Sequence, residues 1–526
     1  MRDHVIAVDV GTGSARAGVV DRNGQLLVRC EHPILLRRPQ DERGEHGSED
    51  IWRACCHAVR GALQQSGIAP DRIAALAFDA TCSLVLRDHD GAPLALETED
   101  GEAFDTIAWL DHRAATEAEE CNRTGHPTLA HCGGSISPEM QMPKLMWLKR
   151  HRPDLWDRVG YLFDLSDFLT WRATGSTERS VCTLTSKWNF VAGRVSGWQA
   201  DFLSLIGLDD LVQKGTLPDT AVPVGAPVGR LSAAGAAELG LDETVSVAAG
   251  MVDAYAGALG VLGGVAADPH TLHQQTALVG GTSSCIISFA GDPQFGKSLW
   301  GPYRETVFAG QWLIEAGQSA TGALLGHLLR LHSLGGDPTP ERHQQVIARV
   351  QQLRAIEGAG FADRIAILPD FHGNRSPFAD PHLTGVISGL TLDTSFDGLG
   401  RLYWRACVAI ALGLRQILET MAASGTHSSV LHLTGGHVKN PLLVELYADV
   451  TGCDLVIPDS RDAVLVGTAM NAAAAGGLYK SLTAAGAAMA PSGQRIAPNP
   501  ARKALYDRDY AKFLTMQRHR VELNGL

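Results

Sequence analysis

The chain has 526 residues, of which 45% are hydrophobic and 19% are charged, and it contains 57 glycines. This composition excludes a disordered or fibrous protein, and the length exceeds what one hydrophobic core supports, so two domains are expected. The formal net charge of -12 and the lack of a basic run argue against a nucleic-acid partner, because binding to the phosphate backbone needs a clustered basic face.

The N-terminus and the cysteines bear on the compartment. Asp9 interrupts the first apolar run, no signal-peptide core is recognisable, and no window approaches the roughly 18 apolar residues of a membrane span. The ten cysteines form no Cys-x-x-Cys pair, so neither a zinc site nor a disulfide framework is expected. We therefore expect a cytoplasmic protein with no membrane partner.

The opening segment predicts three strands separated by a glycine-rich loop and a turn. Apolar residues alternate in VIAVDVGTGSARAGVV (residues 5–20), and a second turn is expected at residues 21–24. Backbone N–H groups and hydroxyls of the loop could cradle phosphate oxygens, and Asp9 at the strand end could hold Mg²⁺. The alternative is an ordinary hairpin turn with a hydrogen-bonded aspartate. The candidate phosphate ligands in this loop are Thr12, Gly13, Ser14 and Arg16.

Two segments match nucleotide-binding sequence patterns but lack the secondary structure that those motifs require. GTGSAR (residues 11–16) resembles the start of a dinucleotide-binding Gly-x-Gly-x-x-Gly, but Arg16 replaces the third glycine and a strand is expected where a helix is required. GDPQFGKS (residues 291–298) satisfies the P-loop pattern, but Gly301-Pro302 follows it and cannot open the necessary helix. We interpret the second as a surface loop.

The next segments alternate between helix and strand. Helical spacing covers residues 51–67, 143–159 and 163–175, and residues 72–88 read as a strand. Residues 231–244 and 476–493 resemble connectors. Asp79, Asp111 and His112 fall near strand or loop ends, where polar side chains suit polyol hydroxyls; the alternative for His112 is a lone surface or core histidine.

Asp253 is expected at the entrance of a helix rich in alanine and glycine. The free N–H groups of a helix N-terminus favour the charged form of a carboxylate. An ionised aspartate there could orient a sugar hydroxyl for phosphoryl transfer, which needs only late proton acceptance. The alternative is a helix cap.

The pattern of the opening segment returns near residue 276. TALVGGTSSCIISFAG (residues 276–291) again reads as strand, Gly-Thr-x-Ser turn and strand. The two turns lie about half a chain length apart, which an ancient duplication explains economically; chance similarity of two short turns is the alternative. The candidate phosphate ligands of the second turn are Gly281, Thr282 and Ser283.

The last third of the chain predicts a long helix over residues 399–425, a strand in SVLHLTGG and a helix in PLLVELYADVTG. Gly435 and Gly436 between the latter two would let a flat purine approach the backbone, and Asn440 could bond the purine edge or a phosphate. A plain strand-to-helix turn is the alternative. The whole pattern indicates α/β layering with mixed sheets.

Taken together, these segments resemble the FGGY family of carbohydrate kinases over essentially the whole chain. The D-ribulokinase-like members are the most similar, through VDVGTGSARAG, FDATCSL, WLDHRA, CTLTSKWNF, GGTSSC, EAGQSATG, DFHGNRSP and GGHVKNPL. Of these, DFHGNRSP is specific to that branch. The glycerol kinase pattern has an arginine directly after its Trp-x-Asp, whereas His112 intervenes here before Arg113, which weakens a reading as a glycerol kinase.

The resemblance implies two duplicated actin/hexokinase/Hsp70-like (ribonuclease H-like) α/β domains, at residues 1–262 and 263–526, with an active-site cleft between them. It implies Asp253 as general base, Asp9 as the Mg²⁺ residue, and the two loops with Gly435, Gly436 and Asn440 as the ATP site. Lys187 and Glu315 would contact the ketose, and Asp79, Asp111 and His112 would line the pocket.

The expected activity is therefore ATP-dependent and Mg²⁺-dependent phosphorylation of a pentulose, D-ribulose first. The alternatives are L-ribulose, D-xylulose or ribitol as acceptor, and an ATP-binding sugar sensor that transfers no phosphoryl group. A homodimer is the common habit of the family.

Overall fold

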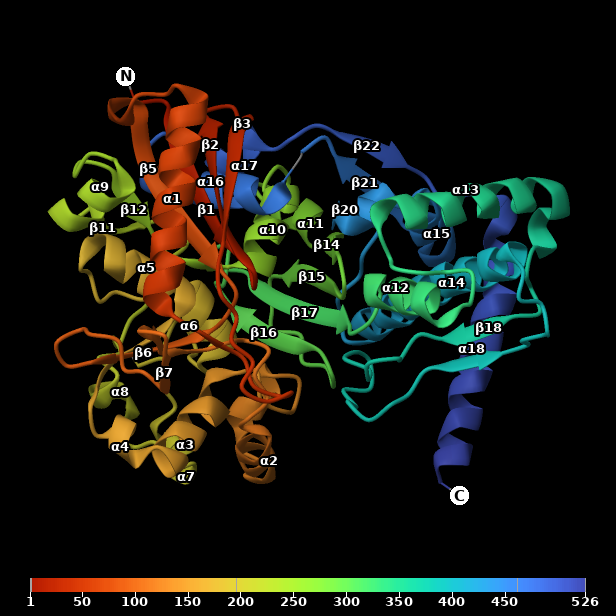
Figure 1. Cartoon of the computed structure of the whole chain (residues 1–526), viewed down its shortest axis with the longest axis horizontal. Helices are drawn as coiled ribbons and strands as arrows, with labels where there is room; N and C mark the ends of the chain where they lie inside the picture. The colour runs from red at the N-terminus through yellow and green to blue at the C-terminus, as the bar shows by residue number, and fades with distance from the viewer. Residues whose placement is uncertain (1, 195, 461, 526) are drawn as a thin grey trace.

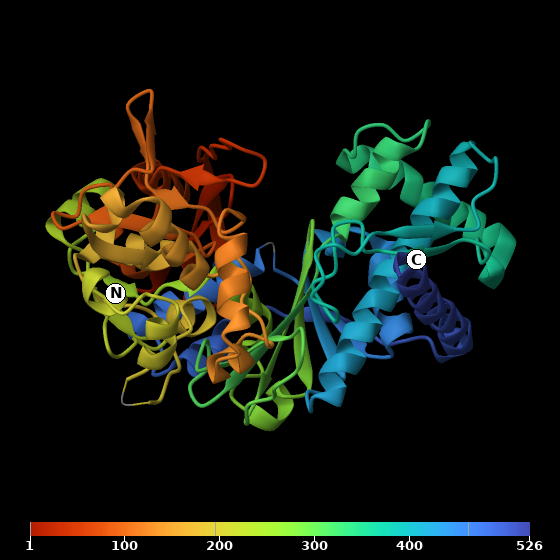
Figure 2. The ribbon, with the colours of Figure 1, turned by 90° about the horizontal axis from the view of Figure 1, so that it is seen from below.

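The computed structural model describes residues 2–194, 196–460 and 462–525. It is a mixed α/β structure of two lobes, each built on a twisted sheet with helices packed against it (Figure 1). Turned by 90°, the lobes lie on either side of a central region that contains the strands and helices of residues 253–318 (Figure 2).

The sheet of the first lobe has the strand order β11-β12-β5-β1-β2-β3, with β13 also paired to β5. Its central strand β1 is antiparallel to β2 and parallel to β5. The strands are β1 (His4–Val10), β2 (Ser14–Asp21), β3 (Leu26–Pro33), β5 (Ile73–Ala80), β11 (Pro227–Arg230), β12 (Ser246–Ala248) and β13 (Met251–Val252).

The sheet of the second lobe repeats this plan, in the order β16-β17-β15-β14-β20-β21-β22. The run β17-β15-β14-β20-β21 matches β3-β2-β1-β5-β12 in order and in the direction of every pairing. This correspondence supports a duplicated fold. The strands are β14 (Gln275–Gly280), β15 (Ser284–Ala290), β16 (Trp300–Arg304), β17 (Trp312–Gln318), β20 (Val430–Gly435), β21 (Asp454–Pro458) and β22 (Gly493–Ile496).

In the described residues of the first half, the remaining elements form a small second sheet, a hairpin and ten α-helices. The strands are β4 (Glu45–His46), β6 (Leu84–Asp88), β7 (Glu97–Glu99), β8 (Glu102–Phe104), β9 (Thr106–Ile107) and β10 (Val159–Asp164). The helices are α1 (Ser48–Ser66), α2 (Ala115–Arg123), α3 (Gln141–His151), α4 (Pro153–Trp156), α5 (Leu165–Thr174), α6 (Val181–Lys187), α7 (Ala200–Leu205), α8 (Leu211–Lys214), α9 (Ala233–Leu239) and α10 (Asp253–Leu262).

The part of the second half that the structure describes adds one short two-stranded sheet and eight α-helices. The strands are β18 (Ala366–Leu368) and β19 (Val386–Ser388). The helices are α11 (Pro269–Leu272), α12 (Gly322–Leu331), α13 (Pro340–Glu357), α14 (Phe396–Ala423), α15 (Pro441–Thr451), α16 (Ala463–Ala475), α17 (Leu482–Met489) and α18 (Lys503–Asn524).

Helix α16 belongs to the second half of the sequence but packs on the first lobe. It contacts β1, β5 and β12, and it crosses α10 closely (Figure 1). Glycine makes this crossing possible: an added Cβ would lie 1.9 Å from the carbonyl oxygen of Ala463 at Gly260, and 1.9 Å from that of Ala256 at Gly467. The backbones of the two helices therefore touch directly, and α10 places Asp253 at its first residue.

The predicted strands around both glycine-rich loops are confirmed, and so are the helices α1, α14 and α15. The predicted helix over residues 143–159 is instead divided, because Arg152 precedes Pro153 and leaves the helical region at φ -134° and ψ 59°. The predicted strand over residues 72–88 is also divided, into β5 and β6.

The interpretation of residues 231–244 and 476–493 as connectors is wrong. The first contains α9, which packs on α1 and α5, and the second contains α17, which packs on α16. Both helices begin with a serine cap: Ser232 Oγ accepts from the N–H of Gly235, and Ser481 Oγ accepts from that of Ala484. Packing and capping offset the low helix propensity of glycine in these segments.

The expectation that no segment would be long and apolar enough for a membrane span is also wrong. Helix α14 is long and apolar enough to cross a membrane by length and composition alone. It is, however, the central helix of the second lobe. More than half of its apolar window is buried, against α12, α13, α15 and α18 among others. A helix that is apolar on most faces is expected in the core of a large domain.

Candidate active site

Two matching hairpin loops lie at the ends of the central strands β1 and β14. In the first loop, the N–H of Gly11 donates to the carbonyl of Ser14 at 3.0 Å; in the second, the N–H of Gly281 donates to the carbonyl of Ser283 at 2.8 Å. Gly13 at the tip of the first loop is exposed. Both loops are closed by a hydrogen bond from a glycine N–H, but the first bond reaches three residues ahead and the second reaches two. Each loop is short enough to bring its backbone close to a ligand.

The first loop is held in place by its neighbours. The indole Nε1 of Trp109 donates to Thr12 Oγ1 at 3.0 Å, and Ser14 Oγ donates to Glu31 at 2.6 Å. Gly11 leaves room for the guanidinium of Arg16, since an added Cβ would lie 2.3 Å from its Nη2. The assignment of Thr12, Gly13, Ser14 and Arg16 as phosphate ligands stays a prediction.

The second loop is fixed by the N-terminus of α12. The N–H groups of Gly322 and Ala323 donate to the carbonyls of Gly281 (3.0 Å) and Thr282 (3.1 Å). An added Cβ on Gly322 would lie 2.6 Å from the carbonyl oxygen of Gly281. This close approach holds the loop carbonyls of Gly281 and Thr282 against the N-terminus of α12.

The loop after β20 lies beside the second hairpin loop, because Gly435 and Gly280 are register partners in parallel strands. His437 joins the two: its Nε2 lies 2.9 Å from the carbonyl oxygen of Gly281, and its Nδ1 lies 2.8 Å from Tyr447 Oη. The carbonyl can only accept, so Nε2 carries the proton and Tyr447 donates to Nδ1. Burial lowers the pKa of His437 to about 4, so the ring is neutral.

Asn440, predicted to contact the nucleotide, caps α15 by accepting from the N–H of Leu442 at 3.1 Å and is buried. Gly435 has a φ of 83°, and an added Cβ would lie 2.4 Å from the carbonyl oxygen of Gly280. An added Cβ at Gly436 would lie 3.8 Å from the same oxygen, which is ordinary contact. The backbone between β20 and α15 is thus free of side chains at the two glycines, as approach by a flat ring requires.

Gly13→Ala tests whether the first loop holds phosphate. An added Cβ at Gly13 meets nothing within 4 Å, so the variant should fold and melt as the wild type does. If phosphate oxygens occupy the space at the loop tip, the same methyl group should raise KM for ATP by about tenfold, or ~1.4 kcal/mol. Steady-state kinetics with a thermal melt measures both. An unchanged KM for ATP would contradict this role of the loop.

Asp9 and Asp79 lie side by side at the ends of parallel strands β1 and β5, as register partners. Burial raises the pKa of Asp9 to about 7, although its ion pair with Arg16 (Nη1 to Oδ2, 2.9 Å) acts to lower it. Burial and the neighbouring charge of Asp9 raise the pKa of Asp79 well above its usual range. Thr468 on α16 donates a hydrogen bond to Asp79.

This carboxylate pair fits Mg²⁺. Oδ1 of Asp79 is buried and has no hydrogen-bond partner among the described residues, so the pair holds an unused acceptor. Mg²⁺ favours one or two carboxylates together with water and substrate phosphate over a cage made only of protein groups.

Asp253 is the first residue of α10, as expected, and its Oδ1 accepts from the N–H of Ala254 at 2.7 Å. The helix N-terminus was expected to lower the pKa of Asp253, but the pKa is raised. Burial raises the pKa, and the hydrogen bond and the charges of Lys187 and Arg16, which lower it, do not fully offset that effect. A carboxylate with a raised pKa is a better proton acceptor than an ordinary aspartate.

Lys187 and Glu315 come from opposite halves of the chain and lie near Asp253. Lys187 ends α6, and its Nζ lies 5.8 Å from the ring centroid of Tyr255. Tyr255 donates to Glu315 Oε2 at 2.7 Å. Burial alone would lower the pKa of Lys187, but Cys82 and Glu315 raise it above its usual range. The lysine is therefore charged within a group of acidic side chains.

Asp111 and His112 differ in what they contact. Both oxygens of the buried Asp111 are occupied, by Arg113 and by the N–H of Gly44. His112 is half exposed, and its Nε2 lies 3.5 Å from Glu139 Oε1. The contacts of Asp111 serve to hold its loop, while His112 faces an open region. The roles of both residues, and of Asp79, in sugar binding stay predictions.

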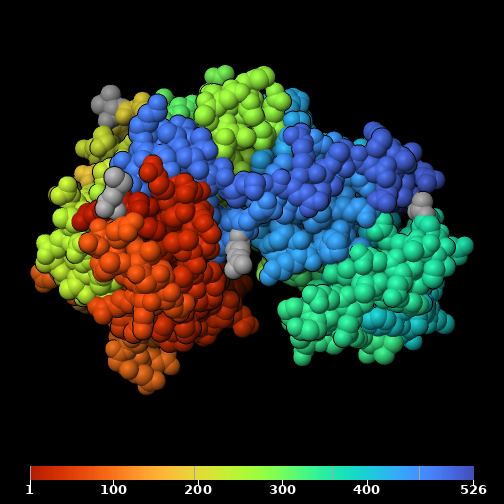
Figure 3. All heavy atoms as spheres, turned by 90° about the horizontal axis from the view of Figure 1, so that it is seen from above, coloured from red at the N-terminus to blue at the C-terminus, as the bar shows by residue number. Residues whose placement is uncertain are grey.

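A groove opens between the two lobes (Figure 3). Side chains from the two halves of the chain contact one another, as Tyr255 does Glu315 and Glu139 does Arg375. Several residues that contact the predicted ones received no role from the sequence, although Trp109, Arg375 and His437 lie within the motifs WLDHRA, DFHGNRSP and GGHVKNPL that carry the family resemblance. They are Trp109, Glu139, Tyr255, Gly322, Arg375, His437 and Thr468.

Comparison with known protein families gives two matches that cover most of the chain. Residues 4–260 match the N-terminal domain of the FGGY family of carbohydrate kinases, and residues 276–476 match its C-terminal domain. Among curated proteins, the human FGGY carbohydrate kinase domain-containing protein is 40% identical over 99% of this chain and 97% of its own length. The D-ribulokinase of Saccharomyces cerevisiae is 36% identical over 89% of this chain and 71% of its own length.

Solved structures share the fold at lower sequence identity. The xylulose kinase of Rhodospirillum rubrum superimposes with a TM-score of 0.82 at 22% identity, covering 99% of this chain and 100% of that one. The glycerol kinase of Plasmodium falciparum with ADP has a TM-score of 0.78 at 13% identity, with 98% of both chains covered. These structures confirm the predicted fold class.

Proposed function

The chain belongs to the FGGY family of carbohydrate kinases, and on that basis we propose that it transfers a phosphoryl group from ATP to a pentulose, forming D-ribulose 5-phosphate from D-ribulose. The name of the yeast relative, D-ribulokinase, supports this acceptor over other pentuloses. The ten cysteines are all free, which suits a reducing compartment, and we place the reaction in the cytoplasm.

The observation that carries the proposal is the position of Asp253 relative to the two hairpin loops. Arg16, just after the first loop, lowers the pKa of Asp253, and the charge of Asp253 in turn helps to raise the pKa of the Cys285 thiol, just after the second loop. The same carboxylate is near Lys187 and Glu315. One acidic side chain thus lies near both hairpin loops and near Lys187 and Glu315, which supports a role between the phosphates and the sugar.

In the proposed reaction, Asp253 accepts a hydrogen bond from the terminal hydroxyl of the sugar and directs that oxygen toward the γ-phosphorus. The proton passes to Asp253 late, because the transition state is loose and the oxygen needs little activation. Lys187 and Glu315 hold hydroxyls of the sugar, and the two hairpin loops hold the phosphates from opposite sides. Orientation supplies most of the rate enhancement.

Asp9, with Asp79 beside it, would hold Mg²⁺ against the phosphates. The ion would neutralise charge on the transferring phosphoryl group. Arg16 already pairs with Asp9 and keeps that carboxylate oriented toward the first loop.

Water is a competing acceptor, and the arrangement of the site in a groove between lobes offers a way to exclude it. Binding of the sugar to residues from both halves, Lys187 and Glu315, would draw the lobes together and complete the site. Sugar-driven closure is the general means by which kinases suppress hydrolysis of ATP.

A panel of pentuloses and pentitols with Mg²⁺-ATP tests the proposal. We expect the largest kcat/KM with D-ribulose, and ADP release without sugar at less than about a hundredth of that rate. Lys297→Ala serves as a control: Lys297 is exposed in the segment between β15 and β16, and no helix follows it. The P-loop interpretation predicts loss of activity in this variant, whereas we expect kcat and KM within about twofold of wild type.

Two outcomes would redirect the assignment. A larger kcat/KM for another pentulose or for ribitol would change the acceptor but leave the reaction class. ADP release at the same rate with every sugar and without sugar would contradict sugar phosphorylation and favour an ATP-binding sensor.

A further inference from the structure

The segment at residues 369–376, between β18 and β19, is anchored on the side that faces α14 and α18. Asp370 accepts from Asn374 Nδ2 at 2.8 Å and from Arg520 Nη1 at 2.6 Å. On the other side of the chain, the N–H of Ser376 donates to the carbonyl of Gly317 at 3.1 Å, and Ser376 Oγ donates to that of Ser298 at 2.8 Å. The backbone of this segment is therefore fixed on both sides of residue 375.

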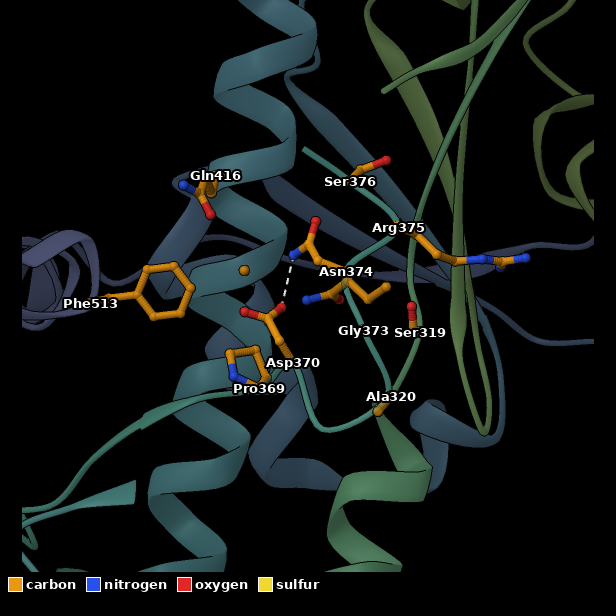
Figure 4. A pocket seen from close by; sticks show the side chains of 12 residues that line it. Ser319, Ala320, Pro369, Asp370, Gly373, Asn374, Arg375, Ser376, Gln416 and Phe513 are labelled. Atoms are coloured by element: carbon orange, nitrogen blue, oxygen red, sulfur yellow. Dashed lines mark hydrogen bonds between the residues drawn. The ribbon is translucent and has the colours of Figure 1, made fainter. Parts of the chain in front are cut away.

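Arg375 leaves this anchored segment in the opposite direction. Asp370 and Asn374 point toward the small cavity between α14 and Phe513, whereas the side chain of Arg375 extends away from it (Figure 4). Its path crosses Gly317, where an added Cβ would lie 3.3 Å from Arg375 Cδ. Gly317 lies two residues after Glu315 on β17, so the arginine runs along the face of the strand that carries Glu315.

The guanidinium ends above Trp300 and beside Glu139. It lies 5.2 Å from the Trp300 ring centroid, and Trp300 is the register partner of Glu315. Nη2 lies 3.4 Å from Glu139 Oε2 in the first lobe. Among the described residues, Glu139 is the only hydrogen-bond acceptor that the guanidinium reaches. An arginine has five N–H donors, so most of them are free.

Glu139 is held ionised between the side chains of His112 and Arg375. Burial would raise its pKa, but His112 and Arg375 lower it to about 2. The side chains of Glu139 and Arg375 remain 28% and 22% exposed, which leaves both accessible to a ligand. A carboxylate and a guanidinium from different lobes thus stand together beside Trp300, the register partner of Glu315.

The pair of Glu139 and Arg375 lies away from the second hairpin loop. Ser284, at the end of that loop, is the register partner of Gln318, so a side chain that runs from Gly317 toward Glu315 leads away from the loop. Arg16 acts on Asp253, whereas Glu139 contacts His112 and Arg375. Lys187 and Glu315 lie between, because Lys187 interacts with Glu315 and Glu139, and Asp253 with Lys187. A sugar with its terminal hydroxyl at Asp253 would therefore present its other end to Arg375 and Glu139.

We propose that Arg375 and Glu139 form the subsite for the hydroxyketone end of the sugar, with the guanidinium donating to the ketone oxygen at C2 and the carboxylate accepting from the hydroxyl at C1. This inference rests on the proposed function. A ketone oxygen only accepts hydrogen bonds and suits a group that only donates. A pentitol carries a hydroxyl at C2, whose proton would have to turn away from the guanidinium. The pair therefore selects ketoses over polyols of the same carbon skeleton.

Arg375→Met tests the subsite, with D-ribulose, D-xylulose and ribitol as acceptors. Removal of the charged donors should lower kcat/KM by about 30-fold for each ketose. The two losses should be similar, because D-ribulose and D-xylulose share C1 and C2. For ribitol, kcat/KM as a substrate or the inhibition constant as a competitive inhibitor should change by less than about threefold. KM for ATP should not change. Arg375→Lys should recover part of the ketose activity. Glu139→Gln should reduce the ketose preference without removing a cation.

The control is Arg349→Met, since Arg349 pairs with Asp397 between α13 and α14, at 2.6 Å; ketose and polyol kinetics should both stay at wild-type values. A thermal melt of each variant separates loss of folding from loss of a contact. Equal losses for ketoses and ribitol, or unchanged ketose kinetics, in folded Arg375→Met would overturn the subsite and leave the proposed function standing. A wild-type protein that phosphorylates no pentulose would overturn both.

Discussion

Asp253→Asn is expected to lower kcat for sugar phosphorylation by at least about 10³-fold. The amide keeps the size of the side chain and can still accept from the N–H of Ala254, but it cannot take the proton of the sugar hydroxyl. Because the loops that hold the phosphates are untouched, the Kd for ATP should remain within about threefold of the wild-type value. Single-turnover assays together with equilibrium ATP binding measure the two effects separately.

Asp462→Asn is the matched control for this variant. Asp462 belongs to the same acidic group around Asp9, but its side chain caps α16 by accepting from the N–H of Leu465, and asparagine caps helices equally well. We expect kcat within about threefold of wild type. Residual turnover of more than a few per cent in Asp253→Asn would show that another group accepts the proton.

Gly260→Ala should destabilise the protein by about 3 kcal/mol and lower kcat as well. The added methyl group would meet the carbonyl oxygen of Ala463 at 1.9 Å, and a backbone atom cannot turn aside as a side chain can. The helices α10 and α16 would have to separate, which would move Asp253 at the start of α10 away from Asp9 and Asp79. The apparent melting temperature and kcat should fall together.

Gly257→Ala, one turn earlier on α10, isolates the effect of the crossing. Its added Cβ would lie 3.5 Å from Val464 Cγ2 and 3.6 Å from Val279 Cγ2, which is ordinary contact. Replacing a helical glycine there should stabilise the protein, by up to ~1 kcal/mol. If the two variants melted at the same temperature, the close crossing would not be the source of the effect.

The elements that the sequence predicted well are those whose signals are local. The loops after β1 and β14 stand out because glycine and hydroxyl residues interrupt alternating strands, and the start of α10 at Asp253 follows from an apolar strand that leads into a helix. Helices α9 and α17 were missed because alanine and glycine dominate both, as in linkers. Their serine caps at Ser232 and Ser481 were the available signal.

The partners of the site residues could not be predicted in the same way. Arg375 and Glu139 are 236 positions apart, and Thr468 and Asp79 are 389 apart, so only the folded chain brings them together. The direction of the Asp253 pKa shift was predicted wrongly for a related reason. Its local contribution, from the helix N-terminus, has the expected sign, but burial by residues from both lobes outweighs it.

The position of α16 has a consequence for how the protein is made. This helix covers β1 and β5 of the first lobe, yet it is among the last segments to leave the ribosome. One apolar face of the strands that are synthesised first therefore stays uncovered until nearly the whole polypeptide has emerged. A fragment that stops after α10 would retain that uncovered face permanently, and it should aggregate rather than persist as an independent half.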